Sequence, residues 1–237
     1  MPSLRHIALP LCSAILFVAS AACAHATTIY KDKSSFSSQL SRSVIDDYTD
    51  PDYKYYGRGD DPYEMTDAEM SQAFGETRYT SYRKEYNWLT LLPPYLADSP
   101  SLFYSANDAY EMDFSSTSVS KGNGVYGVGF DYFNILSGFE SANAFVTFGD
   151  GSKKEFYLDT TGPFDGNGVM FFGITSDLGI KSIYIGQDFD AHDYGLYGQA
   201  NLIIGEKRLS GDVPEPGSLA LVGIALAGAG VARRRKA

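Results

Sequence analysis

Two apolar segments, one at each end of the chain, confine any folded domain to the residues between them. The first, residues 7–18, follows the polar side chains of Arg5 and His6 and is too short to span a bilayer. The second, residues 217–232, contains no charged residue. Because both have the pattern of targeting segments, we expect one exported domain made of residues 27–212.

Residues 1–26 are predicted to form a secretory signal peptide. Ala24 and Ala26 give the A-x-A pattern at which signal peptidase cleaves, so Thr27 is the predicted first residue of the mature protein. An uncleaved anchor helix is the alternative. A lipoprotein signal at Cys23 is a weaker alternative, because the usual leucine three positions earlier is missing.

The composition of the mature chain excludes several kinds of site. Both cysteines, Cys12 and Cys23, lie within the predicted signal peptide, so the body has no disulfide, no catalytic thiol and no thiolate metal ligand. Residues 27–212 hold 14 Lys and Arg against 28 Asp and Glu, a net charge of 14 − 28 = −14. Nucleic acid is therefore not an expected partner, because phosphate binding needs a basic surface.

The C-terminal segment, residues 213–237, has three parts in order: a Pro-Glu-Pro triplet, the apolar run and a basic cluster. As a helix, the run would be about 24 Å long, short of the ~30 Å hydrocarbon core unless flanking basic side chains reach the interface. The basic cluster favours the cytoplasmic side, so the body would lie outside. We expect a single transmembrane helix at about 217–232; an amphipathic surface helix is disfavoured because the run has no polar face. The motif residues are Val213, Pro214, Glu215, Pro216, Arg233, Arg234, Arg235 and Lys236.

This segment resembles the PEP-CTERM sorting signal of Gram-negative bacteria. The resemblance implies export across the inner membrane, transient anchoring there, and recognition by an exosortase that cleaves near the triplet. It also implies a final place at the cell surface or outside the cell, in association with exopolysaccharide and biofilm.

The body has the pattern of a mainly β protein. Helices are predicted over residues 32–40, capped by Asp32, and 66–74, where Thr66 and Glu69 form a capping box. Short strands separated by turn residues predict a β-sandwich or jelly roll with one or two short helices. The predicted strands are 28–30, 44–48, 110–114, 124–133, 144–148, 155–158, 169–174, 180–185 and 200–204.

The order of these elements resembles a jelly-roll body common among PEP-CTERM proteins. The shared features are the helix containing Phe36 and the stretches 46–48, 127–131, 171–174 and 180–183. The family's late strand often carries an Asp-Asn pair, and Gln199-Ala200-Asn201 departs from that pattern here.

An acidic loop is the candidate metal site. Asp188, Asp190 and Asp193 surround His192, and carboxylates are the ligands that calcium prefers. Their spacing is not that of an EF-hand, so a solvated acidic loop is the alternative. A lone histidine makes zinc less suitable than calcium, which is the one candidate cofactor.

Clustered carboxylates and tyrosines elsewhere give two further hypotheses. Asp46, Asp47, Asp50 and Asp52 could include the paired carboxylates of a glycoside hydrolase, or they could simply be solvated. Tyr53, Tyr55 and Tyr56 lie in the same loop, 49–63, and aromatic rings beside carboxylates suit sugar binding. Ordinary packing of tyrosine against a β-sheet is the alternative.

The sequence therefore favours an exported, non-catalytic module that binds extracellular polysaccharide. A secreted hydrolase that acts on exopolysaccharide and a purely structural matrix protein remain as alternatives. The expected partners are signal peptidase and exosortase during export, the inner membrane before processing, and polysaccharide afterwards.

Overall fold

The computed structural model describes residues 26–55, 64–82, 86–91, 102–106, 108–120, 122–134, 142–158, 169–188 and 197–209. These residues form two short helices and twelve strands, and all of these elements lie within 27–207. The elements are β1 (Thr27–Tyr30), α1 (Lys33–Ser37), β2 (Leu40–Asp46), β3 (Glu64–Met65), α2 (Asp67–Phe74), β4 (Arg78–Ser81), β5 (Asn87–Leu91), β6 (Leu102–Ala106), β7 (Tyr110–Asp113), β8 (Val125–Asn134), β9 (Ala142–Phe148), β10 (Lys153–Leu158), β11 (Met170–Gly186) and β12 (Tyr197–Lys207).

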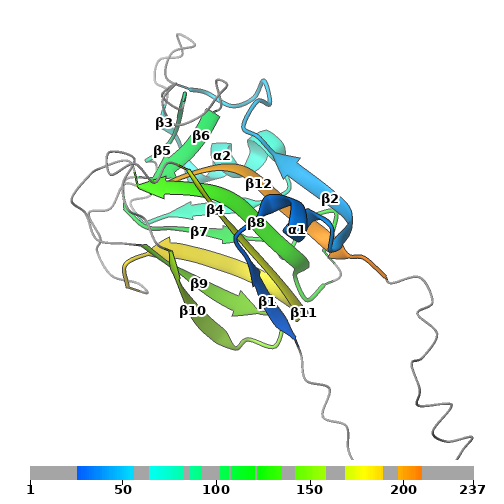
Figure 1. The fold of residues 1–237 in the computed structure, drawn as a ribbon. Helices are drawn as coiled ribbons and strands as arrows, with labels where there is room; N and C mark the ends of the chain where they lie inside the picture. The colour runs from blue at the N-terminus through cyan, green and yellow to red at the C-terminus, as the bar shows by residue number, and fades with distance from the viewer. Residues whose placement is uncertain are drawn as a thin grey trace, which may run out of the picture.

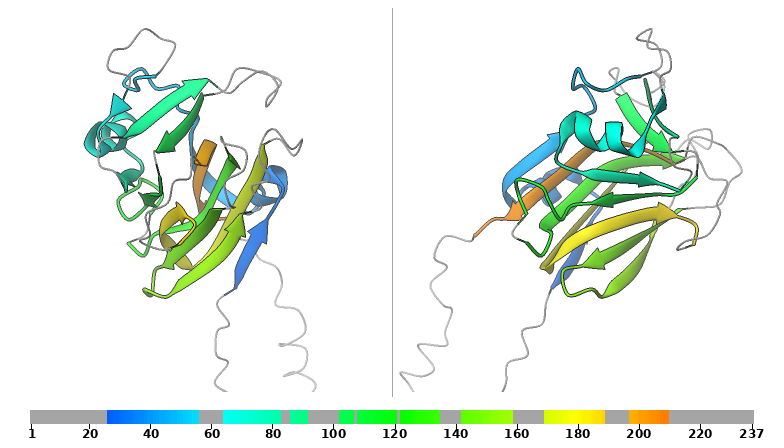
Figure 2. Two further views of the ribbon diagram at one scale, coloured as in Figure 1. Left: turned by 90° about the vertical axis from the view of Figure 1, so that its left-hand side faces the viewer. Right: turned by 180° about the vertical axis from the view of Figure 1, so that it is seen from behind.

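The strands form one curled sheet whose two halves face each other as the layers of a β-sandwich (Figures 1 and 2). The first layer contains β1, the first part of β11, β8, β12 and β2, and continues through β6, β5 and β3. The second layer contains β10, β9, the second part of β11, β7 and β4. The predicted mainly β, sandwich-like fold with two short helices is confirmed.

Strand β11 joins the two layers and corrects one prediction. The sequence predicted two strands, 169–174 and 180–185, whereas the structure has one long strand whose partners change partway along it. Residues 170–175 pair with β8, and residues 180–186 pair with β9. The change occurs beside Gly179, which has a positive φ of 77°, and a bulge follows it. Figure 1 shows the strand turning at this point, so a single strand contributes to both layers.

The first helix is shorter than predicted, because Leu40 belongs to β2 and not to a helix over 32–40. Asp32 caps α1 as predicted, and its carboxylate accepts a hydrogen bond from Ser35 N. The ring of Phe36 is fully buried against the outer face of the first layer. The ring lies directly over Gly129 and Gly173, and a Cβ atom at either position would come within 2.9 Å of it. The glycines therefore make the space into which the helix packs.

The second helix is bounded as predicted and begins with the capping box of Thr66 and Glu69. Its buried residues, Met70 and Ala73, contribute to the main core between the layers.

Strand β7 alternates as predicted, since Tyr110 and Met112 are buried while Glu111 is half-buried. Strands β3 to β6 were not predicted. The core is rich in tyrosine, with Tyr48, Tyr53, Tyr79, Tyr104 and Tyr110 all fully buried.

Both described ends of the chain leave the sandwich at the same end (Figure 1). Asp177 connects them, because its backbone N–H donates to Ala26 O and its carboxylate pairs with Lys207 at 2.5 Å. Thr27, the predicted first residue of the mature protein, is the first residue of β1 and lies opposite Ser176. The chain therefore enters and leaves the described part of the domain at one end of the sandwich.

Candidate functional site

The first acidic cluster takes part in the fold itself. Asp46, the last residue of β2, is 3% exposed, and its carboxylate accepts hydrogen bonds from Tyr48 N and Tyr53 OH. Burial raises its pKa to about 6, because the charged form is poorly solvated there, although both hydrogen bonds oppose the shift. Asp47 accepts from Thr49, and Asp50 accepts from Asp52 N in the following turn. These contacts are those of turns and of the core.

A buried network of hydroxyl and amide groups continues from this loop through the core. Tyr48 OH lies 3.1 Å from Tyr79 OH and accepts a hydrogen bond from Gln199 Nε2 at 2.6 Å. Tyr110 OH donates to Gln199 Oε1 at 2.9 Å. Burial raises the pKa of the Tyr48 and Tyr79 hydroxyls well above the ordinary range, so both stay neutral. Gln199 thus links the two layers, and it lies in the stretch that departs from the family pattern.

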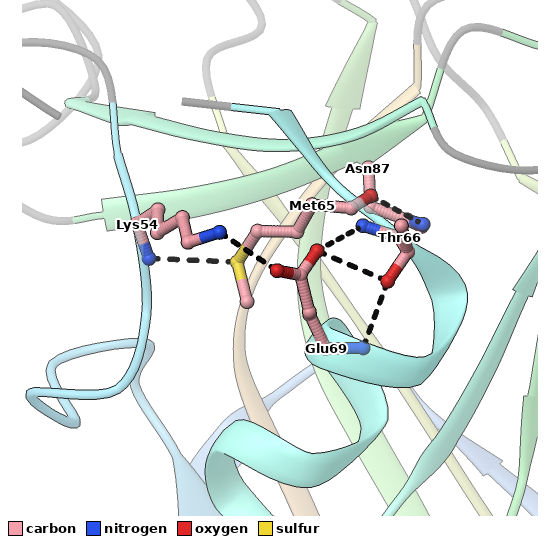
Figure 3. A network of polar contacts seen from close by, with 5 residues as sticks. All are labelled: Lys54, Met65, Thr66, Glu69 and Asn87. Carbon is pink, nitrogen blue, oxygen red and sulfur yellow. Dashed lines mark hydrogen bonds and ion pairs between the residues drawn. The ribbon is translucent and has the colours of Figure 1, made fainter. Parts of the chain in front are cut away.

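The three loop tyrosines predicted to bind sugar are placed as follows. Tyr53 is a core residue with 1% of its surface exposed, so its ring faces protein and not solvent. Tyr55 is half-buried against the main core. Tyr56 lies outside the described residues. The loop is held against α2 by an ion pair between Lys54 Nζ and Glu69 Oε1 at 2.7 Å, and Lys54 N donates to the sulfur of Met65 (Figure 3).

A cavity of about 250 Å³ lies beside this ion pair, lined by Asp52, Lys54, Met65, Glu69, Gln72 and Ala73. The pKa of Glu69 is lowered to about 2, mainly by the hydrogen bond from Lys54. Figure 3 shows the same carboxylate bonded to Thr66 in the capping box. Lys54 and Glu69, two of the three charged residues at the cavity, are therefore paired with each other and position the loop.

The predicted calcium loop is only partly described. Asp188 lies exposed after the end of β11, while Asp190, His192 and Asp193 lie outside the described residues. Among the residues that the structure does describe, no group of three or more His, Cys, Asp or Glu side chains could hold a metal ion. Calcium binding at Asp188, Asp190 and Asp193 stays a prediction.

The targeting motifs are likewise mostly beyond the described residues. Ala24, Val213, Pro214, Glu215, Pro216, Arg233, Arg234, Arg235, Lys236 and the predicted helix 217–232 all lie outside them. Within the described ranges, no helix is long and apolar enough to cross a membrane.

The outer face of the second layer presents aromatic side chains across neighbouring strands. Tyr184 of β11 lies opposite Phe145 of β9, and their ring centroids are 5.9 Å apart. The residues on either side of each, such as Ile183 and Val146, are buried in the core, so both rings point to the outer face. Tyr157 of β10, which alternates with the inward-facing Phe156 and Leu158, is 68% exposed on the same face. We call Phe145, Tyr157 and Tyr184 the aromatic strip.

Polar side chains surround the aromatic strip in register. Glu155 lies opposite Phe145, and Glu111 lies opposite Tyr184 on its other side. Thr80 of β4 lies opposite Glu111 of β7, and Asn143 of β9 lies opposite Tyr157 of β10. A neighbouring row on the same face contains Lys153, Thr147, Ser182, Asp113 and Arg78.

No described helix lies over this face, as the right-hand view of Figure 2 shows. The first layer differs, because α1 packs against its outer face. Tyr184 is only 7% exposed, and its ring lies close to Gly186, where a Cβ atom would come within 2.9 Å of the ring. Tyr157 and Phe145 therefore give this face most of its exposed aromatic surface, and hydrogen-bonding groups lie around them.

Sequence reasoning did not identify the aromatic strip. The pattern over 144–148 and 155–158 predicted two strands, but it did not show which of their residues would be exposed on the outer face. The exposed position of Tyr157 within that alternation is the one feature that could have indicated it.

The described residues form a β-sandwich-like domain whose second layer carries the aromatic strip on its outer face. Residues 212–236 match the model of the PEP-CTERM protein-sorting motif. The chain therefore carries a sorting motif that indicates an exported protein, anchored in the membrane before an exosortase processes it. No curated protein matches the chain.

Several solved structures of carbohydrate-binding modules are similar to part of the chain. A mutant of the family 29 module CBM29-2 complexed with cellulohexaose has 15% identity and a TM-score of 0.30, covering 55% of this chain and 94% of that one. A second mutant of the same module has 16% identity and a TM-score of 0.28, covering 59% and 99%. CsCBM6-3 from Clostridium stercorarium in complex with cellobiose has 12% identity and a TM-score of 0.29, covering 54% and 93%. At TM-scores this low, these similarities support no conclusion about the fold or the ligand of this chain.

Proposed function

We propose that the body, residues 27–212, is a non-catalytic module that binds extracellular polysaccharide through the outer face of its second layer. The observation that carries this proposal is the aromatic strip across β10, β9 and β11, in which Tyr157 is 68% exposed and Phe145 is half-buried. Rings of this kind stack on the apolar faces of sugars, while surrounding polar groups take up the hydroxyls. A flat sheet surface suits a chain polymer better than a small molecule, because it offers contacts along several strands.

The sorting motif supports the same function. Signal peptidase would cleave after Ala26, and an exosortase would process the chain near Pro214. A Gram-negative host would then release the domain to the cell surface or the medium, where exopolysaccharide is present. The end of the sandwich that carries both targeting segments would face the membrane before release.

A hydrolase receives less support from the described residues. Asp46 is buried, and Asp47 and Asp50 hold the backbone of the turn that follows it. None of these carboxylates lies beside the aromatic strip.

Retention on the host's own extracellular polysaccharide tests the proposal. Residues 27–212 contain every described helix and strand, so this segment is the protein to use. We expect wild type to be retained and Tyr157→Ala to bind roughly 5- to 30-fold more weakly, because one well-placed exposed ring contributes on the order of 1–2 kcal/mol. Tyr86→Ala is the matched control, since Tyr86 is also an exposed tyrosine, 46% exposed, but lies outside the strip.

Equal retention of wild type and Tyr157→Ala would contradict the proposed face. Shortening of the polymer during incubation would favour a hydrolase. If wild type is not retained at all, a structural or protein-binding role would replace the proposal.

A further inference from the structure

We propose that Asn123 is a site of spontaneous covalent modification, at which the folded domain loses an amide group with age and becomes less stable. This inference is independent of the proposed function. Asn123 is followed by Gly124, and an asparagine side chain reacts most easily with the backbone in such a pair. Glycine has no Cβ atom, so the side chain meets the least hindrance at the glycine nitrogen.

The reaction requires only water. The backbone nitrogen of Gly124 attacks Cγ of Asn123, and the NH₂ group leaves with the proton of that nitrogen as ammonia, which closes a five-membered succinimide ring. Water then opens the ring and returns a proton to the nitrogen. Breakage of the new N–Cγ bond gives aspartate. Breakage of the original N–C bond gives isoaspartate, in which the main chain runs through Cγ and the former backbone carbonyl becomes a free carboxylate.

The surroundings of Asn123 leave its side chain available for this reaction. Asn123 is exposed in a bend before β8, and it lines a cavity of about 240 Å³. Its amide group forms no hydrogen bond with any of the residues that the structure describes. Asn143 and Asn201 differ, because their Nδ2 atoms donate to Gln187 O at 2.8 Å and to Asp131 Oδ2 at 2.7 Å. These hydrogen bonds hold both amides in place, so we expect Asn123 to react first.

The packing of Gly124 sets the rate. Gly124 lies outside β8, but it is buried so closely that a Cβ atom there would overlap Ile180 O. This packing restricts the approach of its nitrogen to the side chain of Asn123. We therefore expect the folded domain to react more slowly than a free peptide of residues 118–128.

Isoaspartate at this position should destabilise the turn of β11 at Gly179. The backbone oxygen of Asn123 lies against two glycines, since a Cβ atom at Gly149 or Gly179 would overlap it, and Gly149 N donates to Gly179 O at 3.1 Å. Isoaspartate replaces this carbonyl by a carboxylate and lengthens the main chain by one atom, and so close a contact accommodates neither change. The new charge also lies in a cavity lined by Asp177 and Glu206.

Peptide mapping by mass spectrometry tests the modification. Residues 27–212 and the free peptide 118–128 are incubated at mildly alkaline pH, which favours attack by the backbone nitrogen. By the time the peptide is fully converted, at least half of Asn123 in the folded domain should have gained the mass difference between NH₂ and OH. Labelling by an isoaspartate-specific methyltransferase should locate isoaspartate there. The second Asn–Gly pair, Asn167–Gly168, lies outside the described residues and is mapped separately.

Variants connect the loss of stability to this position. Asn123→Gln keeps an exposed amide but would need a six-membered ring, so it should stay intact and keep its Tm after the same incubation. Asn167→Gln is the matched control, because it removes the other pair and leaves Asn123. The modified fraction of wild type and of Asn167→Gln, separated by ion exchange, should have a Tm lower by at least about 2 °C. Freshly purified Asn123→Asp has the new charge without the longer main chain and should keep most of the wild-type Tm.

Intact Asn123 once the peptide is fully converted would overturn the modification site. Conversion without a lower Tm, or the same loss in incubated Asn123→Gln, would overturn the destabilisation. An equally low Tm of fresh Asn123→Asp would overturn the role of the longer main chain. None of these outcomes affects the proposed function, because retention on polysaccharide is measured with freshly purified protein.

Discussion

The buried carboxylate of Asp46 should make the stability of this domain fall as the pH rises through mildly acidic values. Its side chain is 3% exposed, and burial raises its pKa from 3.8 to about 6. Between these two values the folded protein keeps a proton that the unfolded chain has lost. Protonation therefore stabilises the folded state, fully below pH 3.8 and no longer above about pH 6.

The magnitude follows from the shift. A difference of about two pKa units corresponds to roughly 3 kcal/mol in the free energy of unfolding, at about 1.4 kcal/mol per unit. Asp46→Asn keeps the shape of the side chain and removes the titration. Its amide oxygen can still accept from Tyr48 N, and its NH₂ group can donate to the hydroxyl of Tyr53.

Urea unfolding of residues 27–212 at several pH values measures the effect. Wild type and Asp46→Asn share every other titrating group, so the difference between their unfolding free energies isolates Asp46. We expect wild type to lose roughly 3 kcal/mol relative to the variant, mostly between pH about 4 and about 7. Asp47→Asn, at the exposed neighbouring position, controls for the removal of one carboxylate from the chain. If the unfolding free energy of wild type minus that of Asp46→Asn is flat with pH, or grows with pH, the reasoning is refuted.

Three further predictions concern packing, metal binding and processing. Phe36→Ala should lower the free energy of unfolding by about 3–5 kcal/mol, since it leaves a cavity beside Gly129 and Gly173. Gly173→Ala should lower it by about 1–3 kcal/mol, because the new Cβ would come within 2.9 Å of the Phe36 ring. Equal stability of wild type and both variants in urea would contradict this packing. Calcium should raise the Tm of wild type but not of the variant in which Asp188, Asp190 and Asp193 are all changed to Asn; an identical response of both proteins removes the calcium site. The intact mass of the protein from its native host should correspond to a chain that begins at Thr27 and ends near Pro214, and recovery of a chain that extends to Ala237 would contradict exosortase processing.

The sequence predicted those parts of the fold that depend on local patterns. The capping box of Thr66 and Glu69 and the cap at Asp32 depend on contacts within one helical turn, and both helix starts were found. The alternation of Tyr110, Met112 and their neighbours indicated β7 for the same reason. Strand β11 was predicted as two separate strands, whereas it is one strand that pairs with β8 before Gly179 and with β9 after it. Such pairing joins residues far apart in the chain and leaves no local pattern.

The candidate site was harder to predict, because burial decides it. Tyr53 and Tyr157 are the same residue type in polar surroundings, yet one is a core residue bonded to Asp46 and the other is largely exposed. The difference arises from which side of the sandwich each segment reaches. A row such as Glu155, Phe145, Tyr184 and Glu111 combines four strands, and only their register shows it.

Mapping the polysaccharide on the domain by NMR tests the central claim most directly. Ring and methyl signals of residues 27–212 would be followed during titration with fragments of the host's extracellular polysaccharide. The account predicts that the rings of Phe145, Tyr157 and Tyr184 shift together and saturably, while Phe36 and Tyr30 on the outer face of the first layer stay unchanged. Shifts centred on α1 and β2, or no shifts at any ring, would contradict it.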